Sequence, residues 1–337
     1  MLKWLSRLLL VLSLIATIGA TLVYQQIQQA LAVPMQVNSK LVTVSKGSSL
    51  QTVVQQLMQQ NILSNSQLLP WYFRLKARLQ PSYAQVKQGT YLFAGQYTAE
   101  QVLEKIRKGD QHLFSITFAE GSTFVQIQTL LKNHPQVQQT DYQVWLVEQI
   151  KPHQNAEGLL FPDTYLFAAN TPDKTILAQA LNKMAQLRDS EFAPSAEPKL
   201  SWYQTLILAS IIEKETPIEA EMPTVASVFY NRLAKKMRLQ TDPTVIYGLG
   251  DAYKGDITRA HLKQATPYNT YVIKGLPPTP IAMPGLAAIR AAISPAQTDY
   301  FYFVASGDGG HVFSKTLRQH NLAVAQYLKK LKAEANN

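Results

Sequence analysis

The sequence predicts an α+β protein with an N-terminal transmembrane helix, a small α+β module and a larger mixed α+β domain. Three observations predict this fold class. An uncharged and mostly apolar run occupies residues 8–33, capped helical patterns alternate with short strand patterns from residue 41, and a glycine-turn hairpin pattern occupies residues 301–314. At 337 residues, 46% hydrophobic and 16% charged, the chain has a globular composition and the length for two or more domains.

The N-terminal run has the length and flanks of a membrane span. Trp4 and Tyr24 bracket about 20 residues, enough to cross a hydrocarbon core of about 30 Å. Lys3 and Arg7 predict that residues 1–7 are cytoplasmic, that 8–28 are the transmembrane anchor, and that the rest lies outside. A cleaved signal peptide is the competing interpretation, because residues 30–32 read Ala-Leu-Ala like a cleavage site, although the long apolar run favours an anchor.

The charge and the residue content of the chain limit the ligands and cofactors that we expect it to bind. The formal net charge is +10, and residues 1–99 contain eight Lys or Arg and no Asp or Glu. Such asymmetry suits an anionic membrane surface or an acidic polymer, although a solvated basic surface is the simpler interpretation. The chain has no cysteine, its six histidines do not approach a metal-binding spacing, and it has no glycine-rich phosphate loop. We therefore expect no disulfide, metal or other cofactor.

The first folded part is predicted at residues 38–110. A strand at 41–44 leads to a Lys46-Gly47 turn, and Ser48 with Gln51 has the spacing of a capping box before a helix. A second helix at 67–79, a strand at 89–95 and a capped helix at 98–108 complete an α+β module. The strand-Lys-Gly-small-small-Leu turn resembles the LysM fold, a βααβ unit that binds N-acetylglucosamine-containing glycans. Because Ser48 replaces the usual aspartate, the resemblance concerns the fold more than sugar binding.

The most informative stretch lies between Ser201 and Asp242. Ser201 and Gln204 form a capping box that begins a helix, and Pro217 ends it, so Glu215 falls in the last turn. Residues three, four and seven positions before Glu215 are aliphatic, whereas Glu213 faces another direction. An apolar face and the negative end of a helix dipole both raise the pKa of a carboxyl group. Glu215 is therefore a candidate general acid, as glycosidic-bond cleavage requires, unless it is simply a solvated helix end.

The segments after this helix predict a wall suited to sugars. A second helix carries Asn231 and Arg232, and Asp242-Pro243 has the pattern of a helix N-cap followed by proline. Residues 265–285 contain five prolines and the aromatic, hydroxyl-rich run 268–271. Aromatic faces stack on pyranose rings, although a proline-rich connection without a ligand also explains this composition. A helix near 285–293, the hairpin and a helix to about residue 332 follow.

Seven motifs in this order carry a resemblance to a known family: EGLLFPDTYLF, ASIIEKET, VASVFYNRL, MRLQTDPTVIYG, YNTY, GLPPTPI and GGHVFS. The chain resembles the YceG-like family of endolytic murein transglycosylases, whose catalytic domain would occupy residues 111–333. The resemblance implies a lyase, anchored in the bacterial inner membrane with its catalytic domain in the periplasm. Its substrate would be nascent peptidoglycan, cut within the strand between N-acetylmuramic acid and N-acetylglucosamine. Peptidoglycan synthases such as penicillin-binding proteins are the implied partners, and nucleic acid is not.

The family's catalytic glutamate lies in its E-K-E-T segment, where Glu213 and Glu215 are the candidates. We favour Glu215 for its apolar face, its terminal position, and the similarity of Lys-Glu-Thr to the Gln-Glu-Ser of other lytic transglycosylases. The implied mechanism uses Glu215 first as an acid and then as a base, and leaves a 1,6-anhydro end. The residues carried over as substrate-binding, each with a capping or packing alternative, are Glu157, Asp163, Asn231, Arg232, Gln240, Thr241, Asp242, Tyr247, Tyr268 and Asn269.

Two other classes of function stay open at this point. In the first, the chain is a non-catalytic tether that holds peptidoglycan while Glu215 is structural. In the second, it is a muramidase that admits water and leaves an ordinary reducing end.

Overall fold

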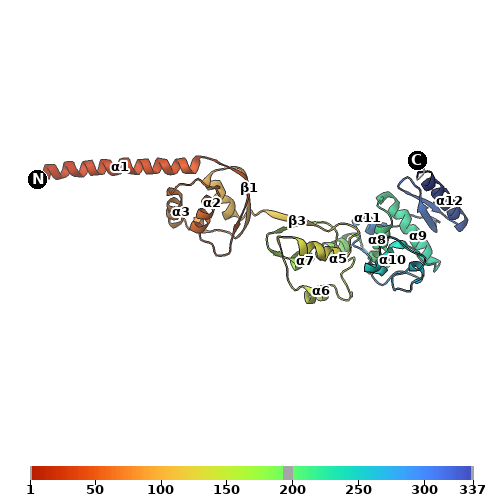
Figure 1. Ribbon diagram of the computed structural model, residues 1–337. Helices are drawn as coiled ribbons and strands as arrows, with labels where there is room; N and C mark the ends of the chain where they lie inside the picture. The colour runs from red at the N-terminus through yellow and green to blue at the C-terminus, as the bar shows by residue number, and fades with distance from the viewer. Residues whose placement is uncertain (1, 193–199, 335–337) are drawn as a thin grey trace. The chain divides into compact units, whose positions relative to one another are not determined.

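The computed structural model describes residues 2–192 and 200–334, so Met1 of the predicted cytoplasmic segment lies outside the described residues. The chain divides into two compact units. The first comprises Met1–Phe114 and Phe167–Asn170, and the second comprises Ser115–Leu166 and Thr171–Asn337. The coarse α+β class predicted from the sequence is confirmed, with helices more abundant than strands (Figure 1).

The first unit contains a βααβ segment between two further helices. Its elements are α1 (Leu2–Ala32), β1 (Met35–Val44), α2 (Leu50–Gln59), α3 (Leu68–Leu79), the short 3₁₀ helix η1 (Pro81–Ala84), β2 (Gly89–Tyr97) and α4 (Ala99–Lys108). β1 and β2 pair antiparallel, from Met35 opposite Tyr97 to Val44 opposite Gly89. Their buried side chains Val42, Tyr91 and Phe93 pack with the apolar faces of the helices to form one core.

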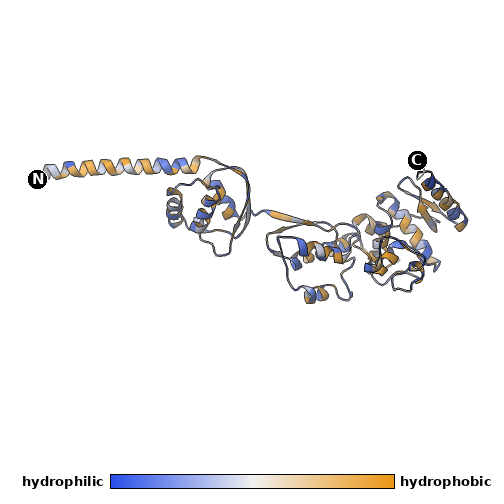
Figure 2. Cartoon of the chain, in the orientation of Figure 1, coloured by the Kyte–Doolittle hydropathy of each residue, from blue (hydrophilic) through white to orange (hydrophobic). Residues whose placement is uncertain are grey.

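Helix α1 combines a membrane-like segment with a packed end. Residues 7–32 form a helix long and apolar enough to cross a membrane by length and composition. The helix is orange, the colour of hydrophobic residues, along its middle and bluer towards its ends (Figure 2). Near its C-terminal end, Ile27 and Leu31 are buried in the core of the first unit. The last turns of α1 therefore belong to the folded unit.

The second unit is mainly helical. Its helices are α5 (Phe124–Asn133), α6 (Gln143–Gln149), α7 (Asp173–Glu191), α8 (Trp202–Glu215), α9 (Met222–Ala234), α10 (Asp242–Leu249), α11 (Leu286–Ile293) and α12 (Leu317–Glu334), with short 3₁₀ helices η2 (Glu219–Glu221), η3 (Gly250–Ala252) and η4 (His261–Lys263). Two strand pairs lie wholly within it, β4 (Val137–Gln138) with β6 (Thr171–Pro172) and β7 (Tyr302–Ala305) with β8 (His311–Ser314). β3 (Leu113–Thr117) pairs with β5 (Thr164–Ala168), and the sequence boundaries between the two units fall within these two strands.

Helix α8 is the centre of this unit. All residues from Thr205 to Ile212 are buried, and α8 packs against α9, α10 and α11 (Figure 1). The predicted capping box is confirmed: the Ser201 hydroxyl accepts from the Gln204 N–H, and the Gln204 side chain accepts from the Ser201 N–H. The predicted end is also confirmed, since Thr216 is the C-cap and has extended backbone angles before Pro217.

Two predicted helix caps are wrong by one residue. In α2 the cap is Ser49 and not Ser48, because the Ser49 side chain accepts from the Thr52 N–H and the helix begins at Leu50. In α10 the cap is Thr241 and not Asp242, which lies inside the first turn. In both cases a neighbouring polar residue had similar capping propensity, so the sequence did not discriminate between them.

The α2 cap is directly testable. Ser49→Ala should lower amide protection in the first turn of α2 about fivefold, because an N-cap hydroxyl contributes about 1 kcal/mol. Hydrogen exchange followed by mass spectrometry measures this. Ser48→Ala is the matched control and should leave the protection unchanged; a larger effect from Ser48→Ala would contradict the assignment.

Candidate active site

Glu215 ends α8 with its carboxyl group withdrawn from solvent. The three preceding residues on its helix face, Leu208, Ile211 and Ile212, are fully buried. The Thr241 hydroxyl donates a hydrogen bond to Glu215 Oε1. Burial raises the pKa of Glu215 to about 7, above the ordinary value of 4.5. The pKa shift is thus in the direction that the apolar face of the helix predicts.

Neighbouring groups adjust this pKa in both directions. The Thr241 hydrogen bond favours the carboxylate and so lowers the pKa, and the negative charge of Asp242 raises it. The charges of His311 and Arg232 lower it, by less than burial raises it. The net result is a carboxylic acid that holds its proton near neutral pH and can still give it up.

Glu215 faces a cavity of about 360 Å³. The cavity is lined by parts of α8, α9, α12 and β7, by the start of α10 and the segment before it, and by the loop after it. Its lining residues are Glu215, Arg232, Leu239, Gln240, Asp242, Tyr271, Tyr302, Phe303, Leu317 and His320. The set combines polar groups with aromatic rings, which is the chemistry that binds a hydroxyl-bearing ring.

A chain of hydrogen bonds positions Thr241. The buried Asn269 side chain donates to the carbonyls of His261 and Gln264 and so fixes the loop that carries Thr270. The Thr270 hydroxyl then accepts from the Thr241 N–H at 3.0 Å. Asn269, predicted as a cleft residue, therefore acts on the site from inside the loop.

Arg232 and Asn231 hold another wall of the cavity. Arg232 is 7% exposed, and its guanidinium donates to the carbonyls of Phe301 and Leu239, each at 2.6 Å. Asn231 Nδ2 donates to the carbonyls of Thr298 and Tyr300, at 2.8 and 2.9 Å. These contacts tie α9 to the segment that leads into β7.

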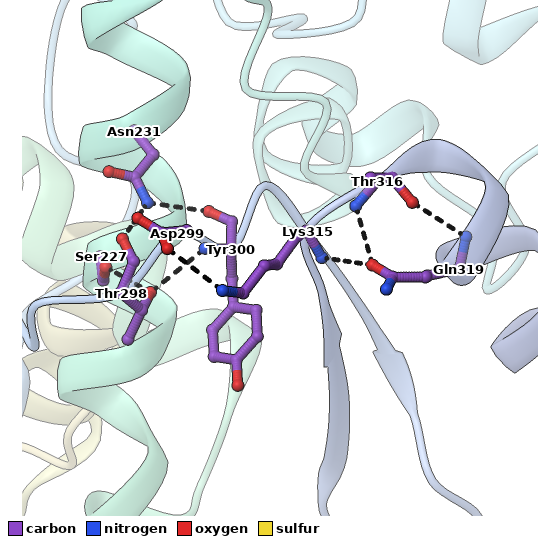
Figure 3. A network of polar contacts seen from close by, with 8 residues as sticks. All are labelled: Ser227, Asn231, Thr298, Asp299, Tyr300, Lys315, Thr316 and Gln319. Carbon is purple, nitrogen blue, oxygen red and sulfur yellow. Dashed lines mark hydrogen bonds and ion pairs between the residues drawn. The ribbon is translucent and has the colours of Figure 1, made fainter.

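The surrounding polar network fixes both ends of the hairpin (Figure 3). Ser227, one turn before Asn231 on α9, pairs with the Thr298 hydroxyl at 2.8 Å. After β8, Lys315 forms an ion pair with Asp299 at 3.1 Å. The Gln319 side chain accepts from the Thr316 N–H at the start of α12. Asn231 is therefore part of the support of the cavity wall.

The alternative glutamate, Glu213, is engaged elsewhere. Its Oε2 accepts from the Gly285 N–H at 3.0 Å, at the N-terminus of α11. Burial raises the pKa of Glu213 as well. However, Glu213 is not among the residues that line the cavity, which matches the different direction predicted for it on the helix.

Three predicted residues meet in a separate polar cluster, which we call the Glu157 cluster. Glu157 is 4% exposed and accepts from the Phe124 N–H and the Tyr247 hydroxyl. The Tyr247 and Tyr268 rings contact edge to face with centroids 4.8 Å apart. None of these three lines the cavity with Glu215. Asp163 also lies apart from the cavity, just before β5, in an ion pair with Lys183 of α7.

His311, which the sequence places in the hairpin with a substrate contact as the less favoured interpretation, pairs with Glu221 outside the cavity lining. His311 lies at the start of β8, and its ring nitrogen Nδ1 is 2.8 Å from Glu221 Oε2. The backbone N–H of His311 donates to Glu221 Oε1 at 3.0 Å. The electrostatic interaction with His311 is among the influences that lower the pKa of Glu215. In the sequence, His311 follows two glycines in a predicted hairpin, and no pattern of residues predicted its contact with Glu221, 90 residues away.

Taken together, a buried carboxylic acid that faces a polar and aromatic cavity is the arrangement of a general acid catalyst. The chain belongs to the YceG-like family, whose sequence profile matches residues 42–326. A protein of Bacillus subtilis (strain 168) named endolytic murein transglycosylase is 31% identical over 343 residues, which cover 92% of this chain and 91% of that protein.

Two further relatives extend this comparison. A protein of the same name from Streptococcus pneumoniae serotype 2 (strain D39 / NCTC 7466) is 25% identical over 345 residues, covering 90% of this chain but 62% of the longer pneumococcal protein. The 2.6 Å crystal structure of a YceG-like protein from Listeria monocytogenes aligns with a TM-score of 0.52 at 30% identity, covering 85% of this chain and 99% of that one.

The Glu157 cluster makes a testable contribution to stability. Burial raises the pKa of Glu157 to about 7, above the ordinary value of 4.5. Because the pKa of Glu157 is raised in the folded state, its protonated carboxyl group stabilises the folded protein. This stability is fully present below about pH 4.5 and is lost as the pH rises through about 7. The loss is on the order of 1 kcal/mol of unfolding free energy per pH unit. Glu157→Gln should remove this loss, so the variant should be more stable than the unmodified protein at pH 8.

Chemical denaturation of the full chain in detergent between pH 4 and 8, followed by tryptophan fluorescence, measures this effect. The exposed Glu148 supplies the control, since Glu148→Gln should keep the slope of the unmodified protein. Equal slopes for Glu157→Gln and Glu148→Gln would contradict the account.

Proposed function

We propose that this chain is a membrane-anchored endolytic murein transglycosylase, a lyase that cleaves peptidoglycan within the glycan strand. The observation that carries the proposal is Glu215, an acid with a pKa of about 7 that faces a cavity suited to sugar rings. Family membership and the names of the Bacillus subtilis and Streptococcus pneumoniae relatives support the same activity. The bond cleaved would be the one between N-acetylmuramic acid and N-acetylglucosamine.

The proposed reaction uses one carboxyl group twice. The Glu215 proton moves to the glycosidic oxygen as the bond from that oxygen to C1 of the muramic acid breaks. The oxygen of the 6-hydroxyl group on the same sugar then attacks C1, and its proton goes to the Glu215 carboxylate. The products are a free 4-hydroxyl end and a 1,6-anhydro ring, no water is consumed, and the acid is restored.

The cavity assigns different roles to the residues around Glu215. Gln240, Asp242 and Arg232 line the cavity with Glu215, and we propose that they contact the sugar rings. Thr241 would hold the carboxylate after proton transfer, because its hydroxyl donates to Oε1. We assign Asn231 and Asn269 as positioning residues, because Asn231 holds a wall of the cavity and Asn269 fixes the loop that carries Thr270. Asp163 and the Glu157 cluster make contacts away from this cavity.

We further propose that α1 anchors the enzyme in the bacterial inner membrane by a single span within residues 8–28, with residues 1–7 cytoplasmic and the catalytic domain, 111–333, in the periplasm. The apolar character of residues 7–32 supports an anchor. The burial of Ile27 and Leu31 also supports it, because cleavage after the Ala-Leu-Ala sequence at 30–32 would remove both side chains from the core.

Residues 38–110 are proposed as a LysM-like module. The order β1, α2, α3, β2 and the antiparallel pairing of β1 with β2 support this proposal. Nascent glycan strands are polymerised at the same membrane, so peptidoglycan synthases are the partners that the proposed function implies.

Substitution of the proposed acid tests this function most simply. Glu215→Gln should lower glycan cleavage by at least about a hundredfold, because general acid–base catalysis contributes about that much or more. Mass spectrometry of digested glycan strands should show 1,6-anhydro ends with the unmodified enzyme. Glu213→Gln is the matched control and should keep most of the activity.

Each other outcome of this assay rejects part of the proposal. Ordinary reducing ends would identify a water-using muramidase, and no cleavage by the unmodified protein would identify a non-catalytic tether. Loss of cleavage in Glu213→Gln with cleavage intact in Glu215→Gln would reverse the assignment of the acid.

The pH dependence of cleavage follows from the pKa of Glu215. Because the acid must be protonated to begin the reaction, kcat/KM should fall as the pH rises through about 7 and then decrease roughly tenfold per pH unit. Thr241→Val should move this fall to higher pH, since the lost hydrogen bond had lowered the pKa. Glu213→Gln should leave its midpoint in place. A midpoint that Thr241→Val moves to lower pH would contradict the account.

A further inference from the structure

Helix α3 of the first unit exposes three large apolar side chains. Trp71 is 56% exposed, Leu75 is 40% exposed and Leu79 is 74% exposed. They follow one another at intervals of four residues and so share one face of the helix. The opposite face already supplies Leu69 and Phe73 to the core. The exposed apolar face is therefore additional to what folding of the unit requires.

Two arginines border this face. Arg74 and Arg78 are both exposed, and at 100° per residue they fall with Trp71, Leu75 and Leu79 within an arc of about 140°. We call these five residues the α3 face. Lys76, by contrast, is an ion-pair partner of Glu100 at 2.5 Å and stacks over the Tyr83 ring. Of the three cations on this helix, Lys76 is therefore held within the unit.

The position of α3 along α1 is also informative. α3 packs against α1 within the first unit, and the side chains of α1 buried in the core of that unit include Ile27 and Leu31. Ile27 lies three residues after Tyr24, which is about 4.5 Å along a helix axis. The headgroup layer on each side of a bilayer is about 5–8 Å thick. A bilayer crossed by the apolar part of α1 would thus place α3 at headgroup depth.

We propose that the α3 face docks on the outer leaflet of the membrane that α1 crosses. Trp71, Leu75 and Leu79 enter the boundary between headgroups and acyl chains, and Arg74 and Arg78 pair with the phosphates of anionic lipids. This is the composition of an interfacial amphipathic helix. Charge complementarity favours a lipid surface, because residues 33–99, which follow α1, carry six Lys or Arg and no acid. The inference rests on the proposed anchoring by α1.

Docking would give the first unit two attachments to the bilayer. A single helix leaves a unit free to rotate and tilt about its exit point, whereas a second contact on α3 fixes its orientation. The first unit would then lie flat against the membrane surface at which new glycan strands are made.

The absence of cysteine from the chain allows a direct test in the full-length protein. Leu79→Cys carries an environment-sensitive fluorophore, and the labelled protein is reconstituted in nanodiscs with anionic lipids and nitroxide-bearing acyl chains. The matched control is Leu41→Cys on β1, which is 48% exposed in the same unit. Figure 1 draws β1 and α3 on different sides of this unit. The label at 79 should be quenched several-fold more than the label at 41.

Neutralising the arginines separates electrostatic docking from burial of apolar surface. The double substitution Arg74→Gln and Arg78→Gln should weaken the docking equilibrium about thirtyfold, since each basic residue near an anionic surface contributes about fivefold. Replacing anionic by zwitterionic lipid should have a similar effect. Cleavage of soluble glycan strands should be unchanged in this variant, because neither arginine belongs to the site around Glu215.

The outcomes distinguish this inference from the proposals on which it rests. Equal quenching at 79 and 41 in protein that stays in the nanodisc would overturn docking and leave the anchor intact. Protein that is released from the nanodisc would overturn the anchor itself. A label at 79 that responds to isolated glycan strands and not to lipid would assign the α3 face to glycan and also overturn docking.

Discussion

The central constraint in this structure is that a carboxyl group must leave water in order to keep its proton near neutral pH. The second unit meets this constraint by ending its most buried helix, α8, at Glu215. Burial of the helix face contributes the largest part of the pKa shift, and the neighbouring charges only adjust it. The position at which this buried helix ends therefore produces the proton donor. Any change that unwinds the end of α8 would expose the carboxyl group of Glu215.

The other residues of the site depend on this helix end, because they approach Glu215 from several different segments of the chain. Thr241 reaches Glu215 from the segment before α10, and that segment is held by Thr270 and indirectly by Asn269. Arg232 reaches the cavity from α9 and is fixed by two backbone carbonyls. The groups are positioned by buried hydrogen bonds, so the cavity is formed before any substrate binds.

Local signals were read correctly from the sequence where one residue had no close competitor. The capping box at Ser201, the stop at Pro217 and the direction of Glu215 all follow from spacing within one helix. The caps at Ser49 and Thr241 did not, because an adjacent polar residue matched the same pattern. The residue types alone also did not show which of the predicted site residues line the cavity and which belong to the Glu157 cluster. That division is set by packing between segments distant in sequence, as Tyr247 and Glu157 illustrate.

The most direct test of the central claim is the ionisation of Glu215 itself. Its side-chain carboxyl carbon can be followed by NMR in protein labelled with ¹³C at that carbon of glutamate, with Glu215→Gln used to assign the signal. We expect a midpoint at about pH 7, because burial outweighs the Thr241 hydrogen bond and the nearby positive charges. A midpoint near the ordinary value of 4.5 would show that the carboxyl is solvated, and would contradict its assignment as the proton donor.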